Sequence, residues 1–592
     1  MYKISRGKFL KVSALGLAAS IAPISVWDIS SKENKEFDEK FFKGLLRNND
    51  VSASRYLKSH KNLRRHSQGR PLTKEFAILA ASYYQPDSKY YKSKTVSVRL
   101  ENILSELLLL QYPNGTLDSG GNKQSPPDTA FILENLCPAA FLIKQNGFTG
   151  LENIRDRLNK FLLKAGEALK TGGLHTPNHR WAVSSSLARL YAIYNDESYV
   201  RRIDEWLAEG IYINEDDQYS ERSRNYSVVV NNSFITIGRI LNRPSLFEIV
   251  KRNLYANYYY METNGDLVTL DSRRQDQNYP VPMTVYYLCY RYLANYYNDE
   301  ILGAIAKKIE TFDNFERIIL SRSLIFVLEN SLIGKEIHTN KKLPADYSKL
   351  FALSGLARIR RGNVTASIFG GDDKPLIISS GRSCNPDFFT LRKGSAIIEY
   401  ARFSTSFFNT GYFRSDGVKK EGNKYTLAEK KEAYYYLPMP ESKRDKSGDY
   451  KLSQSLDRRF WSKMDFESRP KTTITLETMI IIVEEKGTFK MDFELHGAEN
   501  TEVTLELCFR LNGELEGVTP AFGNKDFFLK SGYGKYLFGT DMIEFGPGKF
   551  EHDKVHRLDG EVYSTHLGSI KGKGLHVYLT GYVPFKHSIT IR

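Results

Sequence analysis

Four polar loops in the first half of the chain contain side chains that can transfer protons or stabilise negative charge. They span residues 122–128, 175–181, 217–226 and 271–276, and each adjoins an expected helix. Histidine, tyrosine and carboxylate groups act as general acids and bases, while arginine and amide groups stabilise charge that develops during a reaction. Because loops held by a rigid scaffold carry much of protein function, we expect these loops to meet at one site.

The elements that would hold these loops are helices. Apolar residues recur at helical spacing from about residue 73 to 330, and within 151–165 they fall on one broad face. Short Gly, Asn, Asp or Pro segments separate the helices, as in antiparallel helix pairs. No repeat of fixed length is visible, which favours a closed ring of helix pairs over a solenoid. The expected helices are residues 128–144, 151–165, 180–194, 199–209, 227–241, 245–260, 281–297 and 314–328.

After about residue 353 the pattern changes to short alternating runs, as in 472–483 and 503–509, which is typical of antiparallel β-strands. Helices followed by strands indicate two domains in contact. We therefore predict an (α/α) toroid over residues 30–340 and an antiparallel β-sandwich over 355–592. Further expected strands are residues 366–369, 396–400, 536–538, 561–564 and 575–579.

The N-terminus has the layout of an export signal. Lys3, Arg6, Lys8 and Lys11 precede a short apolar stretch at 12–26, so we assign residues 1–29 to a signal peptide. The segment resembles a twin-arginine signal in which Gly7 replaces the second arginine. No later segment has the roughly 18 uninterrupted apolar residues of a membrane helix. The sequence thus predicts a periplasmic or secreted protein with no integral membrane segment.

The chain is basic, with a net charge of +15, which favours encounter with polyanions. Nucleic acid, anionic lipid and acidic polysaccharide all fit this charge, but an exported protein without nucleic-acid-binding motifs favours glycans. The 4 cysteines form no CxxC pair, so neither a zinc ribbon nor a dense disulfide framework is indicated.

One constellation resembles a known family. The dipeptide Asn178-His179 is followed after 47 residues by Tyr226, which ends the acidic and aromatic segment 217–226. With the order of the two domains, this pattern is similar to that of the heparinase II/III-like polysaccharide lyases, over most of the chain. The resemblance implies a toroidal catalytic domain, a β-sandwich and an acidic polysaccharide or uronate-containing oligosaccharide as substrate.

The resemblance also implies roles. In that family a tyrosine at the position of Tyr226 takes part in proton transfer, and residues matching Asn178 and His179 engage the substrate carboxylate or assist as base. The expected reaction is β-elimination at a 1,4-linkage to a uronic acid, which leaves a 4,5-unsaturated uronate. In glucuronate, the C5 hydrogen and O4 share a face, so Tyr226 serves as both base and acid. In iduronate they lie on opposite faces, so His179 would be the base and Tyr226 the acid.

Some relatives bind zinc, but the histidines of the second half are scattered here, so we expect no metal and no cofactor. More faintly, the loops resemble those of toroidal lyases that act on L-rhamnose linked α-1,4 to D-glucuronate. Asp128 also fits a helix cap, and Arg273 and Arg274 a solvated turn. The residues expected to bind substrate are Arg180, Trp181, Tyr219, Glu221, Arg273, Arg274, Gln275, Asp128 and Gln124.

Two other functions stay open. A toroidal glycoside hydrolase would need a pair of carboxylates, for which Asp217, Glu221, Asp271 and Asp276 are candidates. A non-catalytic glycan-binding protein would use aromatic platforms and a basic groove without turnover. The sequence does not indicate the oligomeric state.

Overall fold

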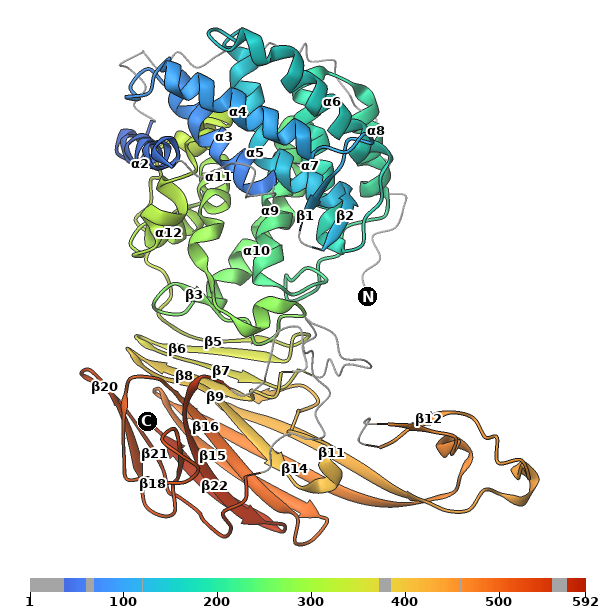
Figure 1. Ribbon diagram of the computed structural model, residues 1–592. Coiled ribbons are helices and arrows are strands. Elements are labelled where there is room, and N and C mark those ends of the chain that lie inside the picture. Colours follow the sequence, from blue (N-terminus) through green and yellow to red (C-terminus); the bar gives the residue numbers. More distant parts are fainter. Residues whose placement is uncertain (1–36, 60–68, 120, 372–384, 457–459, 556–571) are drawn as a thin grey trace.

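A computed structural model describes residues 37–59, 69–119, 121–371, 385–456, 460–555 and 572–592 (Figure 1). The expected signal peptide at 1–29 and the expected strand at 561–564 lie outside these residues. Helices fill the first half of the described chain and strands the second, which confirms the predicted fold class. None of the helices in the described ranges is both long enough and apolar enough to cross a membrane.

The helical half is built from two layers that alternate along the chain. In one layer α3 packs on α5, α5 on α7, and α7 on α9; in the other α4 and α8 each contact α6. Since consecutive helices change layer and direction, the helices of the first layer run roughly parallel. The helices are α2 (Glu39–Lys58), α3 (Gly69–Tyr84), α4 (Lys94–Leu110), α5 (Pro126–Gln145), α6 (Arg155–Thr171), α7 (Pro177–Tyr194), α8 (Glu197–Ala208), α9 (Arg224–Ile240), α10 (Ser245–Tyr260), α11 (Tyr287–Tyr297), α12 (Glu300–Ile309) and α13 (Leu324–Glu329).

Burial separates the two layers. Nearly every side chain of α7 from Trp181 to Leu190 is buried, whereas α8 buries only Tyr199 and Ile203. A helix that is buried all round is surrounded by other elements, and one with a narrow apolar stripe lies at the surface. The layer of α3, α5, α7 and α9 is therefore the inner one.

Two expected helices differ from the structure. Segment 281–297 begins with a short strand, β4 (Val281–Pro282), and a 3-10 turn, and only then forms α11. Segment 314–328 contains a π-helical turn at Glu316–Leu320, a break, and then α13. Apolar spacing alone does not distinguish a continuous helix from such interrupted segments, because the same face is buried in both.

The second half is a β-sandwich of two large sheets. Phe403 of one sheet stacks on Phe493 of the other, with ring centroids 5.5 Å apart, in the core between them. The pairings are antiparallel except that of β19 with β22. One sheet has the order β10 (Lys419–Glu421), β11 (Lys424–Tyr436), β14 (Lys471–Glu485), β15 (Thr488–Gly497), β23 (Phe585–Ile591), β21 (Asp541–Gly546), β20 (Gly534–Phe538), β17 (Glu514–Glu516). The other has the order β18 (Thr519–Pro520), β19 (Asp526–Phe528), β22 (Gly574–Tyr582), β16 (Glu502–Arg510), β9 (Ala396–Thr405), β8 (Phe389–Lys393), β7 (Val364–Phe369), β6 (Leu356–Arg361), β5 (Asp346–Phe351).

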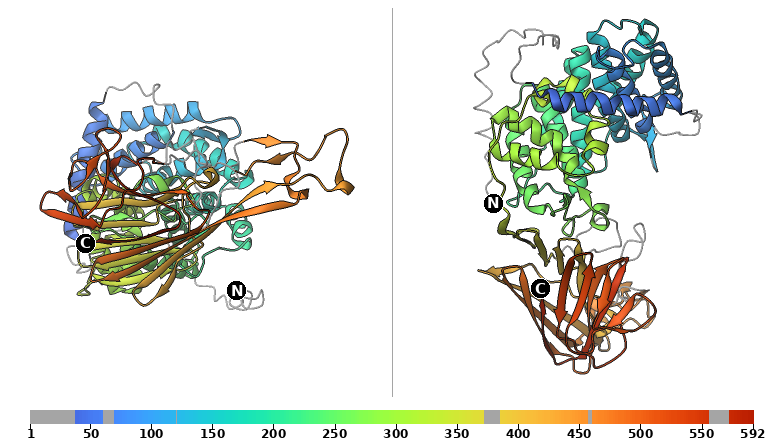
Figure 2. Two further views of the ribbon diagram at one scale, coloured as in Figure 1. Left: turned by 90° about the horizontal axis from the view of Figure 1, so that it is seen from below. Right: turned by 90° about the vertical axis from the view of Figure 1, so that its left-hand side faces the viewer.

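The strands β5 to β7 lie against one end of the toroid, as the side view shows (Figure 2). The first of them, β5, begins at Asp346, between the predicted toroid at 30–340 and the predicted sandwich at 355–592. Buried Arg358 forms an ion pair with Glu262 at 2.9 Å and donates to the carbonyl of Tyr259. The hydroxyl of Tyr258 donates to the carbonyl of Pro344. These contacts join the sandwich to the C-terminal end of α10.

Candidate active site

A cavity of about 690 Å³ lies inside the ring of inner helices. This volume is within the range of roughly 300–1,000 Å³ that small-ligand sites occupy. Side chains from α3, α5, α7, α9 and the 271–279 loop line it, together with apolar residues of α11 and α13. We call this cavity the well.

Four inner helices present their first turns to the mouth of the well. Arg70, Asp128, His179 and Tyr226 all line it, and each is the second or third residue of α3, α5, α7 or α9. The N-terminus of a helix carries partial positive charge and unsatisfied N–H groups. Four such ends at one mouth favour an anionic ligand. Arg222, two residues ahead of α9, donates to the carbonyl of Leu353, so the mouth lies on the side of the toroid next to the sandwich.

The phenol of Tyr226 is held from two sides. Gln275 Nε2 donates to its hydroxyl oxygen at 2.6 Å, and the Arg274 guanidinium lies 4.5 Å from the centre of its ring. Both groups stabilise negative charge on the phenolic oxygen. Three residues that the sequence predicts for the site thus lie together.

Glu221 connects this cluster to α7. Its carboxylate forms an ion pair with Arg274 and accepts from the Asn178 side chain at 2.9 Å. Asn178 is only 1% exposed and does not line the well, which differs from the expected contact with substrate. Its side-chain amide donates to Glu221. In this structure Asn178 therefore holds the Glu221 carboxylate in place, and that carboxylate in turn positions Arg274.

His179 lies at the wall of the well beside His175, with ring centroids 4.8 Å apart. Burial, and then the neighbouring charge of His175, lowers the pKa of His179 to about 4. The imidazole is therefore neutral near pH 7, and its buried Nδ1 has no hydrogen-bond partner. A neutral imidazole has a lone pair that can accept a proton.

Asp128 lies on α5, which packs beside the helix α7 that carries His179. It forms an ion pair with Arg70 at 2.5 Å and accepts from Asn122 at 2.8 Å. It also accepts from Ser125, whose hydroxyl caps α5. Asp128 thus lines the well, but it is not the helix cap that the sequence also allowed, because Ser125 is the N-cap of α5 and Asp128 is the third residue of that helix.

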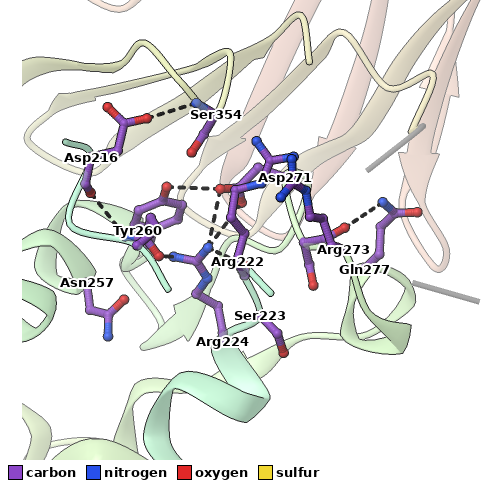
Figure 3. Close-up of polar contacts among 12 residues, drawn as sticks. Asp216, Arg222, Ser223, Arg224, Asn257, Tyr260, Asp271, Arg273, Gln277 and Ser354 are labelled. Atoms are coloured by element: carbon purple, nitrogen blue, oxygen red, sulfur yellow. Dashed lines mark hydrogen bonds and ion pairs between the residues drawn. The ribbon is translucent and has the colours of Figure 1, made fainter. Parts of the chain in front are cut away.

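A buried network sets the position of the 271–279 loop and the start of α9 (Figure 3). Arg224 and Asp271 form an ion pair at 3.3 Å, and both side chains are 0% exposed. The hydroxyl of Tyr260 donates to Asp271 at 3.0 Å. Asp276 accepts from Ser223 at 2.9 Å and from the backbone N–H of Asn225. The loop carrying Arg274 and Gln275 is thereby held against the helix carrying Tyr226.

Five residues predicted to bind substrate lie away from the well. Arg180 forms an ion pair with Glu209, and Trp181 packs in the core against Phe234. The remaining three are buried Tyr219, which donates to Asn231, exposed Gln124, which accepts from Asn114, and exposed Arg273, which donates to the carbonyl of Ser220. The predicted residues that line the well are Asp128, His179, Tyr226 and Arg274.

Several lining residues were not predicted, namely Arg70, Lys74, Glu134, His175 and Arg322. Only His175 lies in one of the polar loops that the sequence singles out. The others are charged residues outside these four loops, for which the sequence offers no motif. Within the ranges that the structure describes, no group of three or more His, Cys, Asp or Glu side chains is arranged to hold a metal ion.

A scan against protein-family models and a search of curated proteins return no match. Solved structures do match. Chondroitin AC lyase from Streptomyces coelicolor A3 has a TM-score of 0.55 at 11% identity, over 94% of this chain and 79% of that one. Heparinase III has a TM-score of 0.52 at 11% identity, over 88% and 76%. Paenibacillus xanthan lyase has a TM-score of 0.54 at 10% identity, over 93% of this chain and 57% of that one.

This chain therefore has the fold of the heparinase II/III-like polysaccharide lyases, a helical toroid followed by an antiparallel sandwich. At this level of identity the likeness concerns the fold, and function must be argued from the site.

Proposed function

We propose that this protein is a polysaccharide lyase that cleaves a 1,4-linkage to a uronic acid by β-elimination. One observation carries the proposal. The phenol of Tyr226 lies in the well between Gln275 and Arg274, and neutral His179 lines the same well. The fold shared with chondroitin AC lyase, heparinase III and xanthan lyase supports the same reaction class.

The reaction needs a base, an acid and stabilisation of negative charge. The base takes the C5 proton, the C5–H electrons form the C4–C5 double bond, and the C4–O4 bond breaks. The departing O4 receives a proton from the acid. Because the C5 proton lies next to a carboxylate, its removal adds charge to a group that is already anionic. Arg274 and the positive helix ends at the mouth are placed to stabilise that charge.

Tyr226 and His179 can divide these roles in two ways. With glucuronate, the Tyr226 phenolate takes the proton and returns it to O4 on the same face. With iduronate, His179 takes the proton from one face and Tyr226 protonates O4 on the other. A substrate carboxylate near His179 would raise the pKa of that imidazole above its value in the empty well, since an opposite charge favours the protonated form. Substrate binding would thus strengthen the base.

A hydrolase on the same fold is less well supported. Of the four carboxylates that the sequence offers for hydrolysis, Asp271 and Asp276 are fully buried. Asp217 is paired with Arg252, and Glu221 with Arg274. None of the four lines the well.

As a finer proposal, the substrate is L-rhamnose linked α-1,4 to D-glucuronate, as in capped arabinogalactan, so the sugar next to the uronate is L-rhamnose. The apolar side of the well, with Val229, Leu288 and Phe326, supports a deoxy sugar at that position. The N-terminal segment at 1–29 supports action in the periplasm or outside the cell.

The test is a panel of uronate-containing glycans: rhamnose-capped arabinogalactan, glucuronan, heparinoids, chondroitin, ulvan and alginate. Elimination creates a double bond conjugated to the carboxylate, so ultraviolet absorbance rises as the chain is cut. A glycan that yields new reducing ends without this absorbance would indicate hydrolysis. Binding without any cleavage, unchanged in Tyr226→Phe, would indicate a glycan-binding protein.

A further inference from the structure

The well extends inward beyond the reactive groups at its mouth. Lys74 follows Arg70 by one turn of α3, and Glu134 follows Asp128 by six residues of α5. At 1.5 Å per residue these side chains start about 6 Å and about 9 Å further in. Both line the well. We call this region the inner half.

Two cations of the inner half form no ion pair among the described residues, although the carboxyl group of Glu134 lies near Arg322. In the part of the chain that the structure describes, Lys74 forms neither an ion pair nor a hydrogen bond, and the side chain of Arg322 donates only to the carbonyl of Ile318, at 2.6 Å. Burial, followed by the charge of Arg322, lowers the pKa of Lys74. Lys74 and Arg322 both line the well and both carry positive charge, so they repel each other, and an anion bound between them would offset that repulsion.

The one carboxylate beside them opposes an anion only weakly. Glu134 has no ion pair or hydrogen bond among the described residues, and burial raises the pKa of its carboxyl group. Its negative charge is therefore disfavoured in the inner half.

A smaller cavity of about 80 Å³ adjoins the inner half and shares Glu134, Asn232, Leu288 and Phe326 with the well. Glu329 lines this second cavity and forms ion pairs with Arg189 at 2.9 Å and with Arg239 at 3.2 Å. The carboxylate of Glu329 is therefore neutralised by its own arginines and does not compete for the two cations of the inner half.

We propose that the inner half is a subsite for an acidic sugar, whose sulfate or carboxylate pairs with Lys74 and Arg322. This inference rests on the proposed lyase function and refines its substrate. It competes with the rhamnose cap proposed above, which carries no acid group, and the glycan panel decides between the two.

The first test measures binding by calorimetry, so it does not depend on turnover. Inorganic sulfate and sodium glucuronate serve as probes of the two anion chemistries, and the probe that binds more tightly identifies the group that the subsite takes. Loss of one charge-assisted contact in Lys74→Gln should weaken binding of that probe about tenfold or more. Lys74→Arg should retain it, and Glu134→Gln should change it little, because burial already disfavours the negative charge of Glu134. Lys419→Ala, an exposed lysine of β10, is the matched control and should bind as wild type does.

The second test uses whichever glycan of the panel is cleaved. Lys74→Gln should raise KM with little change in kcat, since the contact is made before and during the reaction alike. Unchanged sulfate and glucuronate affinity in both Lys74→Gln and Arg322→Gln would overturn the subsite even if the enzyme is an active lyase. Anion binding that depends on Lys74 in a protein that cleaves none of the glycans would uphold the subsite and contradict the lyase function.

Discussion

Replacing Tyr226 by phenylalanine removes one oxygen atom and tests the proposed chemistry. The ring contact with Arg274 at 4.5 Å is retained, and the hydrogen bond from Gln275 at 2.6 Å is lost. That bond contributes about 0.5–1.5 kcal/mol to stability, so the variant should fold. Removal of a general acid–base group lowers rates about 10²–10⁴-fold, or about 3–5 kcal/mol in activation free energy. The loss should therefore appear in kcat rather than in folding.

The assay is the rise of ultraviolet absorbance on the cleaved glycan, with thermal unfolding measured in parallel. Tyr290→Phe is the matched control, because Tyr290 is a fully buried toroid tyrosine whose hydroxyl donates to the carbonyl of Leu254 at 2.7 Å, away from the well. It should lose some stability and keep its activity. Full turnover by Tyr226→Phe would refute the assignment of the phenol as base and acid.

Three further predictions follow from contacts around the well. Glu221→Gln leaves the Arg274 guanidinium without its ion pair, so kcat/KM should fall by a larger factor than the loss of stability explains. Activity equal to that of wild type would contradict the role of Glu221 in positioning Arg274. Asp271→Asn breaks an ion pair whose two side chains are 0% exposed and should cost about 3–5 kcal/mol, seen as a clear drop in the midpoint of chemical denaturation. The pKa of His179 is about 4 in the folded protein and its ordinary value is 6.5, so as the pH falls the unfolded chain protonates this imidazole before the folded protein does. The contribution of neutral His179 to the free energy of unfolding is thus complete above pH 6.5 and is lost as the pH falls toward 4. In His179→Gln the free energy of unfolding should change less with pH over this range.

The fold could be predicted from sequence because its two halves have different periodicities. Apolar residues at helical spacing located α5 to α10, and alternating runs located β14 and β16. The interruption before α13 was missed, since the π-helical turn spans only Glu316–Leu320 and apolar residues lie on both sides of the break.

The site could be predicted only in part. His179 and Tyr226 were found because polar loops at helix starts are visible in the sequence, and both line the well. Trp181 follows His179 by two residues, about 200° around the helix, so it points into the core instead. Lys74 and Arg322 were missed because they lie in apolar surroundings that indicate only packing, and only the closed ring brings them to the cavity.

The proposed site cleaves the uronate linkage by elimination rather than by hydrolysis. Cleavage of the active glycan in water labelled with heavy oxygen tests it directly, with the products examined by mass spectrometry. Elimination adds no water, so products analysed before the new reducing end exchanges its oxygen with the solvent should lack the heavy label, and one product per cut should carry the unsaturated uronate. Incorporation of one labelled oxygen per cut, with no unsaturated product, would contradict the account.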